Sequence, residues 1–419
     1  MLRGFALLGI LLINVELMRG PAFYEVMAGD IPPRSEGIDR VAQFLSGWLA
    51  AGKFVSSFAI MFGLGAALIV GRTIAAGGSP RGILARRYGW LLLIGIAHML
   101  LLFPGDILFV YGITGLVLLA FITVAQRTAL IWSAALIGVT TFLGVLFSWL
   151  AAVMQGAFEA PDDEPFVGTF AGWFADRGEA AVRAHLEGTY LDVLGVNALE
   201  ALIIQLGQIF VLPWLLGLFL LGFVVGRAGI VSDLSAVRPQ LRRAALIGLG
   251  AGLPLTLAQG TVDPIVLIAG SADDQVGPGL VALVMLGQLL GAPVLAVGYL
   301  STLALVTLRF GVVRPLAAVG RMALTAYLLQ SVLTLIVFAG FDLYGQLGPA
   351  EAMLVVFGVW VTLLIICPLW LRWARFGPVE WLWRTLTYGR GQPLRAKRAP
   401  GDGPPGPPDP PAGTPRAQA

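Results

Sequence analysis

The residues best suited to chemistry are His98 and Asp106, which flank a Pro104-Gly105 turn between two apolar segments. Histidine gains or loses a proton near neutral pH, and a neighbouring carboxylate can orient its ring and stabilise its charged form. The pair therefore predicts a site of proton transfer, with His98 as donor or acceptor. The alternative interpretation is a structural pair, because polar groups in hydrocarbon bond to one another wherever they can.

Further polar side chains interrupt the apolar segments. Ionisable and amide groups are costly inside a membrane, so each of them is a functional candidate. Tyr327, Gln330 and Ser331 face the same way on a helix, as do Gln205 and Gln208. For these amides and hydroxyls, hydrogen bonding between helices is the favoured interpretation. The candidate binding residues are Asn14, Lys53, Tyr111, Gln205, Gln208, Tyr327 and Gln330.

The composition argues against several other chemistries. A single cysteine, Cys367, allows neither an internal disulfide nor a cysteine-based metal site. Two histidines argue against a zinc or iron centre built by the protein. The chain has no basic stripe with interleaved aromatic residues, so its sequence does not predict nucleic-acid binding. We therefore expect no metal and no nucleic-acid partner.

The elements that must position the candidates are transmembrane helices. Of 419 residues, 58% are hydrophobic and 12% are charged, whereas soluble domains carry about 25% charged residues. A chain whose outer face meets lipid needs little surface charge. The sequence thus predicts an all-α polytopic bundle of about ten spans, the first of them short, embedded in a lipid bilayer. The apolar segments are 5–18, 48–71, 88–103, 107–125, 129–153, 200–226, 242–262, 279–307, 319–341 and 351–371.

Charge in the connections predicts the orientation. Basic residues follow every second segment, so by the positive-inside rule these connections and both termini are cytoplasmic. The opposite connections are poor in basic residues or acidic, as at 162–164 and at 263–274. These basic residues are Arg72, Arg81, Arg86, Arg87, Arg127, Arg227, Arg238, Arg242, Arg243, Arg309, Arg314 and Arg321, followed by Arg372, Arg375, Arg384, Arg390, Arg395, Lys397 and Arg398 after the last segment.

With this orientation, the polar residues fall at similar depths. His98 lies one or two turns from the outer end of the third segment, and Asp106 begins the fourth. Asn14, Lys53 and Gln205 lie near the outer ends of the apolar segments that contain them. This predicts one hydrated cavity, open to the extracytoplasmic side and shared by five helices.

The same pattern divides the chain. Residues 1–153 and 200–373 form two halves of five spans each, separated by an extracytoplasmic region at 154–199. Residues 374–394 mix tryptophans with arginines, as in an interfacial anchor. Residues 395–419 are too rich in proline and glycine to fold.

Three parts of the chain together resemble the YeiB-like family of bacterial inner-membrane proteins, whose C-terminal half is a domain of unknown function. They are LRGFALLGILLINV at 2–15, GIAHMLLLFPGDILFVYGITGL at 95–116, and GRMALTAYLLQS at 320–331 with FGPVEWLWRTLTYGRGQPLR at 376–395. The resemblance implies a multi-pass protein of the bacterial cytoplasmic membrane. Family members usually carry an aspartate before the LRG element, so we expect the start at Met1 to be late.

That family is distantly similar to membrane acyltransferases of the heparan-α-glucosaminide acetyltransferase type, which move an acetyl group from cytoplasmic acetyl-CoA to a sugar across the membrane. Those enzymes place a catalytic histidine just before the second span, and residues 41–52 here contain none. Either His98 takes that role from another helix, or this chain does different work.

Three functions remain open from the sequence. The leading hypothesis is an acyltransferase-like protein with an outer-facing site at His98 and Asp106, cytoplasmic arginines for an acyl-CoA donor, and a small molecule or sugar as acceptor. The runner-up is a small-solute transporter or exporter in which the same pair relays protons. A structural or sensory membrane protein is the third. The substrate and the oligomeric state are not specified.

Overall fold

The computed structural model describes residues 1–30, 35–157, 165–230, 233–262 and 277–395, and these residues are predominantly helical, as predicted. The acidic connections at 162–164 and 263–274 and almost all of the Pro/Gly-rich tail lie outside the described residues. The α-helices are α1 (Leu2–Met18), α2 (Ala22–Met27), α3 (Gly37–Leu49), α4 (Lys53–Ala75), α5 (Pro80–Leu101), α6 (Leu108–Leu118), α7 (Gln126–Ala157), α8 (Pro165–Leu186), α9 (Tyr190–Gln208), α10 (Leu212–Arg227), α11 (Arg238–Thr256), α13 (Pro278–Leu286), α14 (Ala292–Phe310), α15 (Arg314–Arg321), α16 (Ala323–Phe338), α17 (Pro349–Trp370) and α18 (Pro378–Tyr388).

The helices form a multi-pass membrane bundle. Among the described residues, seven helical stretches are long and apolar enough to cross a bilayer, and an eighth is added if α15 and α16, bent by 91°, count as one span. The other two predicted spans correspond to shorter helices, α1 with 17 residues and α6 with 11. All ten predicted segments are therefore helical, but fewer than ten meet the length of a full span.

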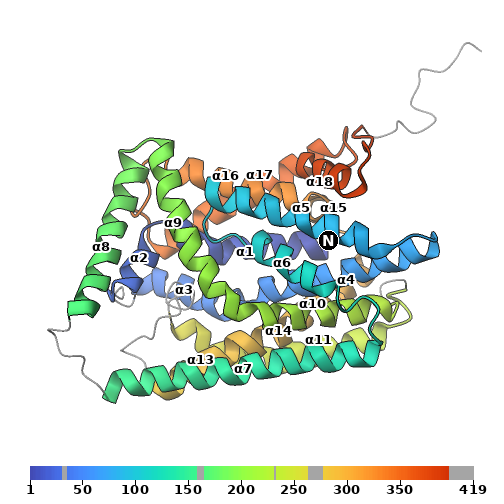
Figure 1. The fold of residues 1–419 in the computed structure, drawn as a ribbon, viewed down its shortest axis with the longest axis horizontal. Helices are drawn as coiled ribbons and strands as arrows, with labels where there is room; N and C mark the ends of the chain where they lie inside the picture. The colour runs from blue at the N-terminus through green and yellow to red at the C-terminus, as the bar shows by residue number, and fades with distance from the viewer. Residues whose placement is uncertain (31–34, 158–164, 231–232, 263–276, 396–419) are drawn as a thin grey trace, which may run out of the picture.

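Helices α4, α5, α7 and α10 run along the length of the molecule, whereas α8 and α9 cross it (Figure 1). Helices α2 and α8 lie at one end of the bundle, and α18 lies nearer the other (Figure 1). Arg3 of α1 and Arg384 of α18 line the same cavity, so both ends of the described chain are on one side.

Two breaks in the helices shape the interior. Gly52 has a φ of +77°, a left-handed conformation that glycine adopts without strain, and it separates α3 from α4. The second break is at Met322, where the chain turns sharply from α15 into α16. The segment predicted at 319–341 is thus a broken element, with a bend of 91° between α15 and α16.

Glycines allow α4 and α10 to cross in close contact. A Cβ atom built on Gly63 would lie 1.8 Å from the backbone oxygen of Phe219, and one built on Gly222 would lie 1.8 Å from that of Ile60. The two glycines therefore form a reciprocal contact between backbones, as small residues do between membrane helices.

We expect Gly63→Ala to destabilise the bundle by about 1–3 kcal/mol or more, because the new methyl group can fit only if α4 and α10 separate. Gly250→Ala on α11 is the matched control, since a Cβ there meets nothing within 4 Å. Thermal unfolding in detergent should show a lower Tm for Gly63→Ala alone. Equal Tm values for the two variants would contradict the close crossing.

Candidate functional site

The centre of the site is a buried chain of three side chains from three parts of the fold. His98 on α5 has its Nδ1 2.7 Å from Asp106 Oδ1 and its Nε2 2.9 Å from Ser331 Oγ on α16. With the proton on Nδ1, the ring donates to the carboxylate and accepts the hydroxyl proton of Ser331. Carboxylate, imidazole and hydroxyl in this order form the arrangement that activates serine in acyl-transfer enzymes.

Asp106 is held in place by the turn on which it lies. Its second oxygen, Oδ2, accepts a hydrogen bond of 2.8 Å from the backbone N–H of Phe109 at the start of α6. Gly95 makes this approach possible, since a Cβ there would lie 2.4 Å from that same nitrogen. From α9, the Gln205 amide donates to the backbone oxygen of Asp106 at 3.0 Å. The carboxylate is therefore fixed on the side of the ring opposite Ser331.

Tyr327 lies one helical turn before Ser331 and covers the face of the imidazole. The ring centroids of Tyr327 and His98 are 5.0 Å apart. The phenol is fully enclosed, and its oxygen accepts a 3.5 Å hydrogen bond from the backbone N–H of Ile107. Tyr327 thus separates the buried triad from the cavity described next.

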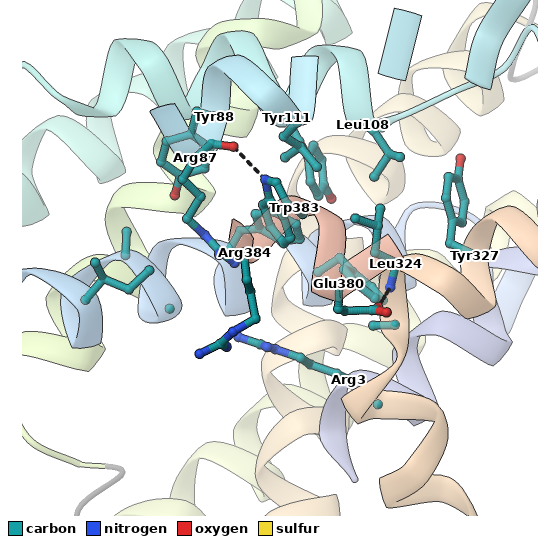
Figure 2. A pocket seen from close by; sticks show the side chains of 18 of the residues that line it. Arg3, Arg87, Tyr88, Leu108, Tyr111, Leu324, Tyr327, Glu380, Trp383 and Arg384 are labelled. Atoms are coloured by element: carbon teal, nitrogen blue, oxygen red, sulfur yellow. Dashed lines mark hydrogen bonds between the residues drawn. The ribbon is translucent and has the colours of Figure 1, made fainter. Parts of the chain in front are cut away.

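A cavity of about 260 Å³ opens at the end of the bundle where both chain ends lie. Arginines from five helices line it, and Tyr327 lines it as well. Figure 2 shows Arg3, Arg87 and Arg384 extending toward the same part of this cavity, while Tyr327 stands at its other end. The arginines are Arg3, Arg72, Arg87, Arg321 and Arg384, and we call this space the arginine cavity.

The arginine cavity suits an elongated anion with an apolar part. Guanidinium groups bind phosphate through charge-assisted hydrogen bonds. The buried Nε of Arg384 has no hydrogen-bond partner among the described residues, so this donor remains free for a ligand. Between the arginines and Tyr327, apolar walls are formed by Phe58, Phe62, Leu91 and Leu108.

Helix α18 forms part of the cavity wall, although residues 374–394 were predicted only as an interfacial anchor. Trp383 is buried, and the guanidinium of Arg87 lies 3.6 Å from its ring centroid. The indole N–H donates to the backbone oxygen of Arg87 at 2.8 Å, as Figure 2 shows. The segment is therefore integrated into the bundle through its contact with α5.

Glu380 attaches α18 to the broken helix. Its carboxylate accepts hydrogen bonds from the backbone N–H groups of Leu324 and Thr325, at 2.6 and 3.0 Å. These are unpaired donors at the start of α16, so Glu380 caps that helix from another part of the chain. Burial raises the pKa of Glu380 above its ordinary value of 4.5.

We expect Glu380→Gln to flatten the dependence of stability on pH. Since the folded-state pKa is raised, the contribution of Glu380 is fully present below pH 4.5 and is lost as the pH rises through the folded-state pKa. Wild-type Tm should therefore fall between pH 4.5 and neutral by more than that of the variant, in which residue 380 cannot ionise. Glu36→Gln, at an exposed carboxylate before α3 that makes no side-chain cap hydrogen bond, is the control. Parallel curves for wild type and Glu380→Gln would contradict this account.

A second, smaller cavity of about 30 Å³ lies on the other side of the triad, toward α8 and α9. Ser331 lines it, and so do His185, Asn197 and Glu200. The triad therefore lies between this outer cavity and the arginine cavity. The imidazole itself is buried, with 0% of its side chain exposed.

The structure separates Lys53 from His98. Lys53 is fully buried at the start of α4, and its Nζ donates to the Gly47 backbone oxygen at 2.9 Å and to the side chain of Gln259, which in turn donates to Gln288. The break at Gly52 turns Lys53 toward this second polar cluster. Glu16 forms a further pair with Arg19, at 2.8 Å. The prediction of a single shared polar layer is therefore corrected to separate groups.

The remaining candidates are distributed around the triad. Tyr111 lines the arginine cavity and donates to the Val55 backbone oxygen at 2.7 Å. Gln330 donates to the Leu7 backbone oxygen at 3.3 Å, in the predicted interhelical manner. Asn14 and Gln208 are half-buried, and no hydrogen bond among the described residues joins either to the triad.

Comparison with known proteins finds similar chains over almost the whole length of this one. The chain is 29% identical to the uncharacterized protein YeiB of Escherichia coli K12 over 413 residues, covering 94% of this chain and 97% of that protein. It is also 29% identical to the uncharacterized protein YxaH of Bacillus subtilis strain 168 over 414 residues, covering 94% and 95%. The chain is therefore similar to YeiB-like proteins over nearly its whole length. The family described as "Protein of unknown function (DUF418)" matches residues 225–390.

The YeiB-like segments that carry the resemblance in sequence meet in space. Residues 2–15, 95–116, 320–331 and 376–395 all contribute to the arginine cavity or to the triad. The DUF418 match includes Ser331 and Arg384 but not His98 or Asp106. No solved structure matches the chain. Among the described residues, no group of three or more histidine, cysteine or acidic side chains could hold a metal ion.

Proposed function

We propose that this YeiB-like protein is a membrane acyltransferase that takes an acyl group from a phosphorylated carrier, such as acyl-CoA, and passes it to an acceptor on the other side of the membrane. One observation carries the proposal: the triad of Ser331, His98 and Asp106 lies between an arginine-lined cavity and a second cavity that faces away from it. We further propose that the arginine cavity faces the cytoplasm of a bacterial cell, by the positive-inside rule.

In the first half-reaction, Tyr327 moves aside to admit the thioester end of a donor held by the arginines, and Ser331 Oγ attacks the thioester carbonyl carbon. His98 Nε2 takes the hydroxyl proton as the C–O bond forms, and Asp106 stabilises the resulting imidazolium. The C–S bond then breaks, and the departing thiolate takes the proton from His98. The products are an acyl ester on Ser331 and a free thiol on the carrier.

In the second half-reaction, an acceptor hydroxyl or amine attacks the acyl ester from the outer cavity, which Ser331 lines. His98 removes the acceptor proton and returns it to Ser331 Oγ as the ester bond breaks. Because the acyl group waits on Ser331, donor and acceptor never need to occupy the site together. Tyr327, between the arginine cavity and His98, would limit leakage between the two sides.

The sidedness of donor use tests this function. Protein reconstituted in vesicles of defined orientation should release free thiol from acetyl-CoA supplied to the arginine-cavity face, with hydroxylamine as a small acceptor on the opposite face. Acetyl-CoA on the opposite face should give no release. Thiol release that is absent from both faces, or that persists unchanged in Ser331→Ala, would contradict the proposal.

A second candidate function rests on the same hydrogen bonds. Asp106, His98 and Ser331 form a continuous chain between two cavities, and such a chain could relay protons in a small-solute transporter. Under this alternative, an imposed pH gradient drives solute flux in vesicles and Asp106→Asn abolishes it, while acetyl-CoA is not consumed.

A further inference from the structure

The outer cavity is lined by a histidine that the triad does not use. His185 lies near the end of α8, at the end of the bundle away from α18 (Figure 1). Its ring stacks on Tyr344 at 3.9 Å between centroids and 4° between planes, and its Nδ1 lies 2.8 Å from the Ala181 backbone oxygen. These two contacts, one with the chain between α16 and α17 and one with α8 itself, hold the imidazole in one orientation.

The hydrogen bond with Ala181 decides which ring nitrogen of His185 is an acceptor. A carbonyl oxygen only accepts, so Nδ1 carries a proton and donates it. Burial lowers the pKa of His185, so the ring is uncharged near neutral pH and its Nε2 carries a lone pair. Among the described residues, none donates a hydrogen bond to this nitrogen. His185 Nε2 is therefore a free acceptor in the wall of the outer cavity.

Asn197 on α9 is a second polar group of the same cavity. The residue is buried, with 4% of its surface exposed, and no hydrogen bond joins its side-chain amide to another described residue. Nearly all buried amides in proteins have hydrogen-bond partners. A buried amide that lines a cavity and has no protein partner is placed to bond with whatever occupies that cavity.

The other polar groups of the cavity leave this pair available. The Ser331 hydroxyl is bonded to His98, and the Thr334 hydroxyl donates to the Gln330 backbone oxygen at 2.8 Å. Glu200 adds a buried carboxyl group, which accepts hydrogen bonds whether or not it is ionised. No lysine or arginine is among the described residues that line the cavity. The cavity therefore suits a group that donates hydrogen bonds.

We infer, building on the acyltransferase function above, that His185 and Asn197 bind the nucleophilic end of the acceptor, and that this end carries two donor hydrogens. A primary amine or a pair of neighbouring hydroxyl groups meets this requirement. One hydrogen is donated to His98 Nε2, which takes it as the new bond to the acyl carbon forms. His98 passes this proton to Ser331 Oγ as the ester bond breaks. The other hydrogen is donated to His185 Nε2 and stays on the product.

The size of the cavity limits how much of the acceptor enters. A single water needs about 10–15 Å³ of such space, so about 30 Å³ holds only a few atoms. A cleft of about 630 Å³ between α8 and α9 adjoins it, and Ala184 and Val196, the chain neighbours of His185 and Asn197, line this cleft. The rest of the acceptor then lies in the cleft, while its nucleophilic end reaches Ser331.

Hydroxylamine and methanol test this assignment, because each has only two heavy atoms and both are mainly uncharged at neutral pH. The attacking nitrogen of hydroxylamine carries two donor hydrogens, whereas the oxygen of methanol carries one. Protein in nanodiscs is acetylated on Ser331 with acetyl-CoA, freed of donor and mixed with either reagent, and the loss of the acetyl ester is followed by mass spectrometry. We expect His185→Phe, which keeps a ring beside Tyr344 but accepts no hydrogen bond, to slow the reaction with hydroxylamine about tenfold or more. The reaction with methanol should change little.

Three further variants make the result decisive. His185→Gln offers an amide oxygen in place of Nε2 and should restore part of the rate with hydroxylamine. Asn197→Leu removes the second contact at similar volume and should also slow hydroxylamine more than methanol, which gives an independent result if His185→Phe does not fold. Glu179→Gln, at an exposed carboxylate of α8 that lines neither the outer cavity nor the cleft, should react as wild type does. An unchanged rate with hydroxylamine in His185→Phe, or equal slowing of both reagents, would overturn the assignment.

Failure of this inference can be told apart from failure of the acyltransferase function. Acetylation of Ser331 is measured before either reagent is added, and no hydrogen bond among the described residues joins His185 to the triad. His185→Phe should therefore be acetylated at the wild-type rate, and slowed acetylation would mean that His185 only supports the fold. If wild type never acquires the acetyl group, the acyltransferase function is wrong. If acetylated protein reacts without regard to His185 and Asn197, the acceptor assignment alone is wrong.

Discussion

His98→Ala is expected to lower the rate of thiol release from acetyl-CoA by about six orders of magnitude, the loss typical when the base of such a triad is removed. Without the imidazole, the Ser331 hydroxyl has no group to take its proton, and the thiolate has no group to protonate it. The measurement is the initial rate of thiol release in nanodiscs at saturating donor.

The members of the triad should act as one unit. Adding Ser331→Ala to His98→Ala should cost little further activity, because either change alone stops the same step. Asp106→Asn should also lower the rate strongly, since an amide cannot stabilise the imidazolium. Ser301→Ala, at a buried serine of α14, is the matched control and should retain the wild-type rate. A His98→Ala rate within a few-fold of wild type would show that this triad is structural.

Arg384→Ala is expected to raise the Kd for acetyl-CoA by about ten- to a hundredfold, because a hydrogen bond to a charged group contributes about 1.5–3 kcal/mol. Arg384 is the strongest candidate contact of the arginine cavity, since its Nε is buried and has no hydrogen-bond partner among the described residues. Titration calorimetry or fluorescence competition in nanodiscs provides the measurement.

The control for this prediction is Arg242→Ala, at an exposed arginine of α11 that does not line the cavity. It removes one positive charge without removing a cavity contact, so its Kd should stay within a few-fold of wild type. Binding should also weaken with added salt, as expected for an anion held by arginines. If both substitutions changed the Kd equally, the effect would come from the general surface charge and not from a contact in the cavity.

The fold class could be predicted because composition alone distinguishes a lipid-solvated helix bundle from a soluble domain. The contact between His98 and Asp106 could also be predicted from the sequence. Both residues flank a Pro104-Gly105 turn, and a turn of that length returns the chain beside the helix it has just left.

Other features depend on contacts between distant parts of the chain. Ser331 is 233 residues from His98, and no pattern in the sequence favoured it over the neighbouring polar residues. The grouping of Lys53 with His98 was wrong because periodicity does not reveal that Gly52 breaks the helix. In the sequence, membrane topology accounted for each arginine separately, as a residue of a cytoplasmic connection. That Arg384 and Arg87 share a cavity follows only from the packing of α18 against α5.

The most direct test of the account is to look for the acyl group on Ser331. Purified protein is mixed with acetyl-CoA in the absence of an acceptor, quenched in acid, digested, and analysed by peptide mass spectrometry. The account predicts an acetyl ester on the peptide that contains Ser331, present in wild type and missing in His98→Ala. Continued consumption of acetyl-CoA with Ser331 unmodified, or an acetyl group at another residue, would contradict it.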